Sequence, residues 1–153
     1  MQISARADYA IRALVELHAR GGGPVTGEVL AEAQQLPPKF LEGILTGLRQ
    51  RDLLHSRRGT DGGYWLARPG ERISVADIIR ATEGPLASVR GVPPDEVSYQ
   101  APAEALAPVW VALRQNLRSV LEAVSIADLV TGELPEAVRR RASHPEARTS
   151  RIR

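Results

Sequence analysis

Apolar residues recur at intervals of three and four positions along most of the chain, which is the spacing of helices that bury one face. The pattern predicts helices at residues 5–20, 27–35, 38–48, 75–83, 104–124 and 126–130. Between the third and the fourth of these, two short apolar runs flank the glycine-rich turn at 59–63 and indicate a pair of strands. The chain is therefore expected to be mainly α-helical with one small β-hairpin.

Polar residues that favour helix starts stand where the apolar periodicity begins. Ser4, Thr26, Ser74 and Ser125 each precede a predicted helix. The hydroxyl group of such a residue can accept a hydrogen bond from a free N–H group of the first helical turn. These four residues are predicted to be helix N-caps.

The order of these elements divides the chain into four parts. Three helices, a hairpin and a further helix give a winged helix–turn–helix domain at residues 1–84. A loop at 85–103 leads to residues 104–132, a long dimerisation helix with a short capping helix. Residues 133–153 are arginine-rich and nearly aperiodic, so we expect a basic, disordered tail.

The third predicted helix has an apolar face that would seat it on the domain, made of Phe40, Leu41, Ile44, Leu45 and Leu48. Its other face is free to enter a major groove, where base edges present distinct donors and acceptors. Glu42 can accept from a cytosine amino group, Lys39 can donate to guanine or phosphate, and Gly43 lets the backbone approach closely. We predict DNA contacts at Lys39, Glu42, Gly43, Thr46 and Arg49.

Two arginines stand at the edge of the hairpin turn, and arginine suits a narrow minor groove of DNA. Successive strand residues point to opposite faces, so only one of Arg57 and Arg58 is expected to reach the groove. Arg58 borders the turn and is the better placed. The alternatives are edge charges that discourage aggregation and, for the third helix, an ordinary solvated face. The hairpin and the helix together favour DNA contact.

The long predicted helix carries an apolar stripe that is typical of a packing seam between two helices. Its members are Leu106, Val109, Trp110, Leu113, Leu117, Val120 and Leu121. We expect this seam to form a homodimer.

Charge is unevenly distributed along the chain, although the net charge is only +2. Residues 37–72 contain seven basic and four acidic side chains, whereas residues 73–133 contain four and eight. The basic segment holds the third helix and the hairpin, so this part is expected to meet an anionic partner.

The composition excludes several kinds of chemistry. The 153 residues include no cysteine and three scattered histidines, so no disulfide, no metal site and no cofactor are expected. Neither a nucleophile–base pair nor a phosphate-binding loop is recognisable, which argues against an enzyme. No apolar run reaches the ~18 residues of a membrane span and no signal peptide is evident, so a cytoplasmic location is expected.

Four motifs occur in a characteristic order: SARADYAIRALVEL at 4–17, PKFLEGILTGL at 38–48, LLHSRRGTDGGYWLARP at 53–69 and ISVADIIRATEG at 73–84. On these motifs the chain resembles the Rrf2 family of bacterial transcriptional regulators over about residues 1–132. The resemblance implies a homodimer on a near-palindromic operator, with Lys39 and Glu42 in the major groove and Arg58 in the minor groove. Members that sense iron, nitric oxide or redox state hold an iron–sulfur cluster through three cysteines, and this chain has none.

The resulting expectation is a homodimeric, sequence-specific regulator of double-stranded DNA, most simply a repressor, that works without a cluster. Its signal is expected to be a small molecule or a protein partner. A candidate effector pocket would lie near Tyr9 and Trp110, between the winged domain and the long helix. The alternative is a winged-helix protein-interaction module that does not bind DNA.

Overall fold

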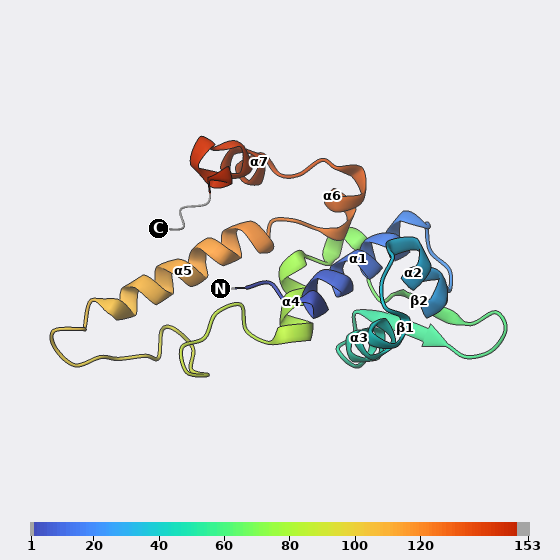
Figure 1. Cartoon of the computed structure of the whole chain (residues 1–153), viewed down its shortest axis with the longest axis horizontal. Helices are drawn as coiled ribbons and strands as arrows, with labels where there is room; N and C mark the ends of the chain where they lie inside the picture. Colours follow the sequence, from blue (N-terminus) through green and yellow to red (C-terminus); the bar gives the residue numbers. More distant parts are fainter. Residues whose placement is uncertain (1, 150–153) are drawn as a thin grey trace.

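The computed structural model describes residues 2–149 and is mainly helical, with one two-stranded antiparallel sheet among these residues (Figure 1). The elements follow in the order α1 (Ala5–Ala19), α2 (Gly27–Gln34), α3 (Pro38–Gln50), β1 (Leu54–Arg57), β2 (Gly63–Leu66), η1 (Gly70–Arg72), α4 (Val75–Glu83), α5 (Leu106–Leu121), α6 (Ile126–Thr131), α7 (Glu136–Ser143) and η2 (Pro145–Arg148). This order confirms the predicted fold class, a winged helix–turn–helix followed by a long helix.

All four predicted N-caps are present. The Ser4 hydroxyl accepts from the Ala7 N–H group at 3.1 Å, and Thr26 Oγ1 accepts from the Val29 N–H group at 3.4 Å. Ser74 and Ser125 form reciprocal capping boxes, each with an aspartate three residues later. Local sequence chemistry therefore fixes where α1, α2, α4 and α6 begin.

Helix α1 is the centre of the hydrophobic core. It packs against α2, α3, α4 and α6, and its Ala10, Ala13 and Leu14 are completely buried. Alanine at two of these positions lets the neighbouring helices approach closely. Ile126 of α6 is also completely buried, so the chain returns to the winged domain after α5.

The hairpin is held to the helices by a third backbone segment. Val25 pairs with Tyr64 through two hydrogen bonds, of 2.9 and 2.7 Å, outside the β1–β2 pairing. A side chain at Gly63 would place its Cβ atom 2.5 Å from the Val25 backbone, and Gly63 has a φ of +140°. The close approach of these two strands therefore requires glycine at this position.

Helix α5 and the segment before it project from the winged domain as an arm, which we define as residues 85–121 (Figure 1). No α5 side chain is buried. The preceding segment is held against α5, because Trp110 Nε1 donates to the Tyr99 hydroxyl at 2.9 Å and Arg114 pairs with Asp95. The predicted loop contains neither helix nor strand before α5, yet these contacts fix its course.

Two features differ from the sequence-based expectations. Phe40, predicted to lie in the core, is 44% exposed because it stands at the edge of the buried face of α3.

Residues 136–148, predicted to be part of a disordered tail, form α7 and η2. Glu136 lies in the first turn of α7 and Arg140 and Arg141 in its last turn, which favours a helix through the helix dipole. The rest of the predicted tail, 150–153, lies outside the described residues.

None of the helices within residues 2–149 combines the length and the hydrophobicity that a bilayer crossing requires.

Candidate nucleic-acid interface

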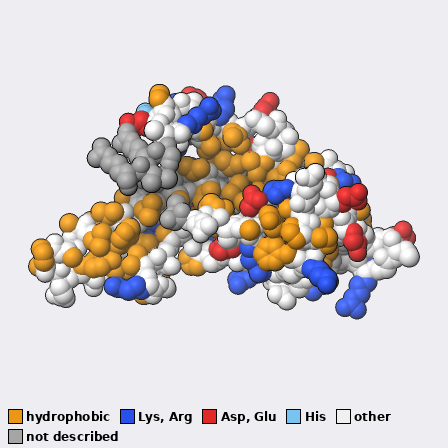
Figure 2. Space-filling model, viewed as in Figure 1, with side chains coloured by type: hydrophobic (Ala, Val, Ile, Leu, Met, Phe, Trp, Pro, Cys, Tyr) orange, Lys and Arg blue, Asp and Glu red, His pale blue; other side chains and the backbone are white. Residues whose placement is uncertain are grey.

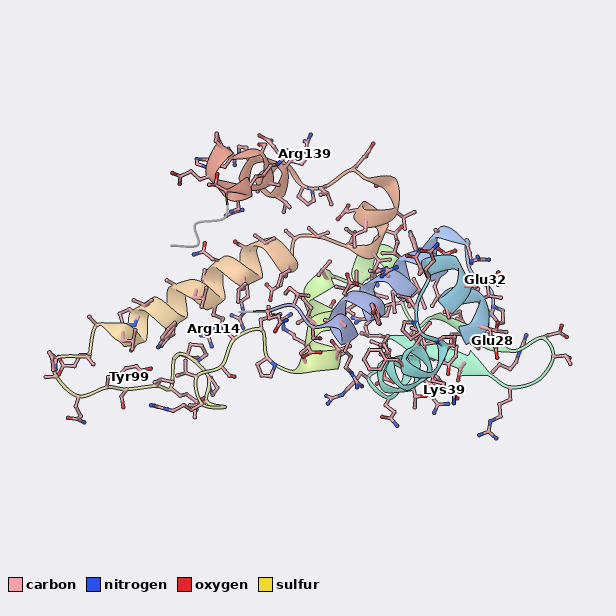
Figure 3. All side chains as sticks on the ribbon, viewed as in Figure 1. Glu28, Glu32, Lys39, Tyr99, Arg114 and Arg139 are labelled. Carbon is pink, nitrogen blue, oxygen red and sulfur yellow. The ribbon has the colours of Figure 1, made fainter. Side chains whose placement is uncertain are left out.

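Helix α3 has the two faces that its sequence predicts, apart from Phe40. Leu41, Ile44, Leu45 and Leu48 are buried against the domain. The side opposite these residues carries the predicted contact residues: Lys39, Glu42, Gly43 and Arg49 are exposed and Thr46 is half-buried. Lys39 projects from the outer edge of the winged domain in Figure 3. A polar helix face of this kind is accessible to a DNA groove.

The turn that sets α3 at its angle is held by polar side chains from α1. Arg12 donates from Nη2 to the backbone carbonyl oxygen of Gln34, the last residue of α2. The Glu16 carboxylate accepts from Gln34 Nε2 at 2.8 Å. The next residue, Gln35, takes a left-handed conformation with a φ of 52° and reverses the chain towards α3.

The Glu16 carboxyl, which accepts from Gln34 in this turn, has a lowered pKa. The hydrogen bond from Gln34 is the main cause that lowers the pKa of the Glu16 carboxyl below its ordinary value; burial opposes it, and the hydrogen bond and charge of Arg20 lower the pKa further. Glu16 therefore remains a charged acceptor for both partners at neutral pH.

Tyr9 and Phe40 form an aromatic contact at the junction of α1 and α3. Their ring centroids lie 5.7 Å apart in an edge-to-face arrangement, and the Arg12 guanidinium lies 5.8 Å from the Tyr9 ring. Phe40 thus contributes to the seating of α3 from outside the core. Of the predicted effector-pocket pair, Tyr9 contacts Phe40 of α3, whereas Trp110 donates a hydrogen bond to Tyr99 in the arm.

The two arginines beside the turn of the β1–β2 hairpin, which we call the wing, differ in their surroundings. Arg57 Nη2 donates to the Asp61 backbone carbonyl at 2.8 Å and closes the turn. Arg58 is exposed, and no hydrogen bond or ion pair within residues 2–149 involves it. Figure 2 shows basic side chains along the edge of the molecule that carries α3 and the wing.

A direct contact joins the wing to α3. Arg49 Nη1 of α3 donates to Ser56 Oγ of β1 at 3.3 Å. Ser56 is not among the predicted contact residues, because the contact depends on how the strand folds back beside the helix. The contact places the polar face of α3 and the wing on one continuous surface.

The groove between α2, α3 and the wing also has acidic lining. Glu28 and Glu42 both line it, beside Lys39 and Tyr64. Carboxylates repel phosphate groups, whereas they can accept from the amino group of cytosine. Glu28 of α2, which is not among the predicted contact residues, therefore belongs to this surface.

The predicted dimerisation seam lies along α5. Leu106, Val109 and Leu113 are exposed, and the half-buried members are Trp110, Leu117, Val120 and Leu121. Figure 2 shows hydrophobic side chains gathered on the arm. This apolar surface is uncovered within a single chain.

The donor atoms of the chain do not fit an iron–sulfur cluster. Such clusters are held by thiolates, and the full sequence contains no cysteine. Within residues 2–149, no three side chains of histidine, aspartate or glutamate converge as metal ligands would.

Comparison with known proteins agrees with this geometry. The Rrf2 family model, described as iron-dependent transcriptional regulator, matches residues 3–132. An HTH-type transcriptional regulator of Mycobacterium tuberculosis, Rv1287, is 48% identical over 151 residues, covering 98% of this chain and 94% of the relative. CymR of Bacillus subtilis is 31% identical over 132 residues, covering 86% of this chain and 91% of the relative.

Solved structures give the same result. The structure of B. subtilis CymR, titled the global cysteine regulator, matches with a TM-score of 0.73 and 30% identity, over 86% of this chain and 98% of that one. IscR of T. potens matches with a TM-score of 0.68 and 32% identity, over 90% of each chain. These relatives are transcriptional regulators rather than enzymes.

Proposed function

Because the chain belongs to the Rrf2 family of DNA-binding transcriptional regulators, we propose that it is a homodimeric repressor of a near-palindromic operator that works without an iron–sulfur cluster. The observation that carries this proposal is the continuous surface formed by the polar face of α3 and the wing, linked through Arg49 and Ser56. The proposed location is the cytoplasm, where the operator would be reached.

Each residue of that surface has a proposed role in binding. Lys39, Glu42 and Thr46 contact base edges in the major groove, and Gly43 leaves room for the backbone to approach. Arg58 enters the adjacent minor groove, where the negative potential is strongest in narrow stretches. Arg49 and Arg57 brace the wing and can also contact phosphates.

The homodimer is proposed to form through the arm. Residues 1–84 would be the DNA-binding domain, 85–103 the connecting segment and 104–132 the dimerisation element. Exposed apolar side chains at Val109 and Leu113 are costly in water, and pairing of two arms would remove them from it. Two recognition helices could then occupy successive major grooves, about 34 Å apart.

Selection of binding sites from a random DNA library, followed by fluorescence anisotropy at several salt concentrations, tests the proposal. A two-fold symmetric consensus with submicromolar affinity and a steep salt dependence is the expected result. Failure to select any duplex sequence would refute the DNA-binding proposal and favour a winged-helix protein-interaction module.

A further inference from the structure

A small cavity lies between the winged domain and the arm. Arg80 of α4 lines it on one side, and Arg114 and Arg118, one helical turn apart on α5, line the other. Figure 3 shows Arg114 where α5 faces the segment that precedes it. Three guanidinium-bearing side chains from two elements thus border one cavity of about 210 Å³.

A shared carboxylate links two of the three guanidinium groups, and the third has a carboxylate partner of its own. Glu122 pairs with both Arg80 and Arg118, and Asp95 pairs with Arg114. The Arg114 hydrogen bond, with a further contribution from the Arg118 charge, lowers the pKa of the Asp95 carboxyl. Asp77, which pairs with Arg80 at 4.0 Å, Asp95 and Glu122 thus offset the three guanidinium charges, so a ligand anion would have to displace carboxylates from them.

These carboxylates lie farther out than the deepest arginine. The Arg114 side chain is 19% exposed, whereas Asp95 is 59% exposed. Each guanidinium has five N–H donors, and within residues 2–149 Arg114 makes one hydrogen bond and Arg118 makes none. An anion could therefore use the remaining donors, while Asp95 and Glu122 can turn towards water at little cost.

The other lining residues of the cavity and its volume limit which anions it can bind. Pro85, Leu86, Ala87 and Pro93 provide apolar surface, which suits carbon atoms better than the oxygens of a free phosphate. A cavity of about 210 Å³ lies below the roughly 300–1,000 Å³ of pockets for drug-sized ligands. The planar guanidinium group of arginine can donate two parallel hydrogen bonds to one carboxylate.

We propose that this cavity binds a small organic acid with one to three carboxylates, held by Arg80, Arg114 and Arg118 and covered by the segment around Leu86 and Pro93. A role for the acid as a signal that controls operator binding rests on the proposed DNA-binding function. Binding of the acid itself does not depend on that function.

The position of the cavity provides a route to regulation. Arg80 belongs to the winged domain, whereas Arg114 and Arg118 belong to the arm, so an anion between them changes the contacts across this junction. Displacing Glu122 from Arg80 would alter the angle between the arm and α4. In a dimer, that angle sets the separation of the two recognition helices.

Isothermal titration calorimetry on the full chain tests the site, with acetate, succinate, glutarate, citrate and inorganic phosphate as probes at constant pH and ionic strength. We expect saturable binding of at least one carboxylate, with one site per chain. Arg118→Gln should weaken that binding by roughly tenfold or more, since it removes a charge-assisted hydrogen bond. Ala87→Leu, which fills part of the cavity without changing charge, should weaken it as well.

A matched control is available at the C-terminal end of α1, where Arg20 is the C-cap. Arg20 also pairs with a glutamate four residues away but lies outside the cavity, so Arg20→Gln should bind the acid like the unmodified protein. No saturable binding of any carboxylate, tighter binding of phosphate, or equal losses in Arg118→Gln and Arg20→Gln would each overturn the proposal. Operator binding, measured separately by anisotropy, shows whether the DNA-binding function has failed instead.

Discussion

Arg57 and Asp61 are joined across the wing turn by a 2.8 Å hydrogen bond from the Arg57 guanidinium to the Asp61 backbone carbonyl. This bond uses the side chain of one wing arginine to hold the turn. Arg58, which follows it in the chain, is exposed at the start of the same turn. The two adjacent arginines therefore differ: Arg57 stabilises the wing turn, whereas the Arg58 side chain is accessible to a ligand such as DNA.

Replacing Arg58 by alanine should weaken specific operator binding by about 1–3 kcal/mol, because it removes a groove contact without disturbing the turn. Arg57→Ala is the comparison, since it should loosen the turn and act mainly through the position of Arg58. Anisotropy titrations at fixed salt measure both affinities. Undiminished affinity of Arg58→Ala would remove Arg58 from the interface.

Replacing Glu42 by alanine should change base preference more than total affinity. The carboxylate accepts from a base amino group but repels phosphates, so its loss relaxes selection at one position while leaving non-specific attraction intact. Parallel site selections on the two proteins measure the change. Glu32→Ala, on the exposed surface of α2, is the control and should keep the original consensus. Identical consensus sequences for all three proteins would contradict this role of Glu42.

Replacing Leu113 by arginine should dissociate the proposed dimer, because a charge would be buried in the seam between two arms. Val111 offers a matched control: it is 37% exposed, compared with 38% for Leu113, but lies off the apolar stripe. Light scattering with size-exclusion chromatography measures the molar mass. The Leu113→Arg variant should run as a monomer and the Val111→Arg variant as a dimer; a Leu113→Arg dimer would rule out this seam.

Replacing Glu16 by glutamine should lower the free energy of unfolding at neutral pH by about 1 kcal/mol, because a charged acceptor for Gln34 and Arg20 is lost. The folded-state pKa of Glu16 lies below its ordinary value of 4.5, so its contribution is complete above pH 4.5 and disappears as the pH falls through the folded-state value.

Urea unfolding at a series of pH values measures this difference. The gap between the unmodified protein and the Glu16→Gln variant should close on acidification below pH 4.5. Glu104→Gln, an exposed position in the arm, should show no such gap at any pH. A pH-independent gap for Glu16→Gln would mean that its charge is not what stabilises the turn.

Features encoded by neighbouring residues could be predicted from the sequence, whereas features that depend on tertiary contacts could not. The caps at Ser4 and Ser74 depend on residues three positions away, so they are readable locally. Val25 pairs with Tyr64 as a single residue, and no periodicity indicates such a strand. Phe40 has the spacing of a core residue, but only the position of Tyr9 shows that it packs at the edge.

The same distinction applies to the candidate interface. Lys39 and Glu42 could be predicted because helical spacing alone places them opposite the buried residues of α3. The link from Arg49 to Ser56 and the cavity between Arg80 and Arg118 join residues that are distant in the sequence. The charge of residues 136–148 predicts a disordered tail, although the alanine and arginine residues at 137 and 139–142 also favour a helix.

No side chain of α5 is fully buried within one chain, so the proposed dimer would add packing that a single chain lacks. By mass action, the order of the arm would then depend on how much protein is present. Its thermal midpoint should rise with concentration, while that of the α1-centred core should change less. The abundance of the protein in the cell would in this way set how much of it is competent to bind a two-fold symmetric site.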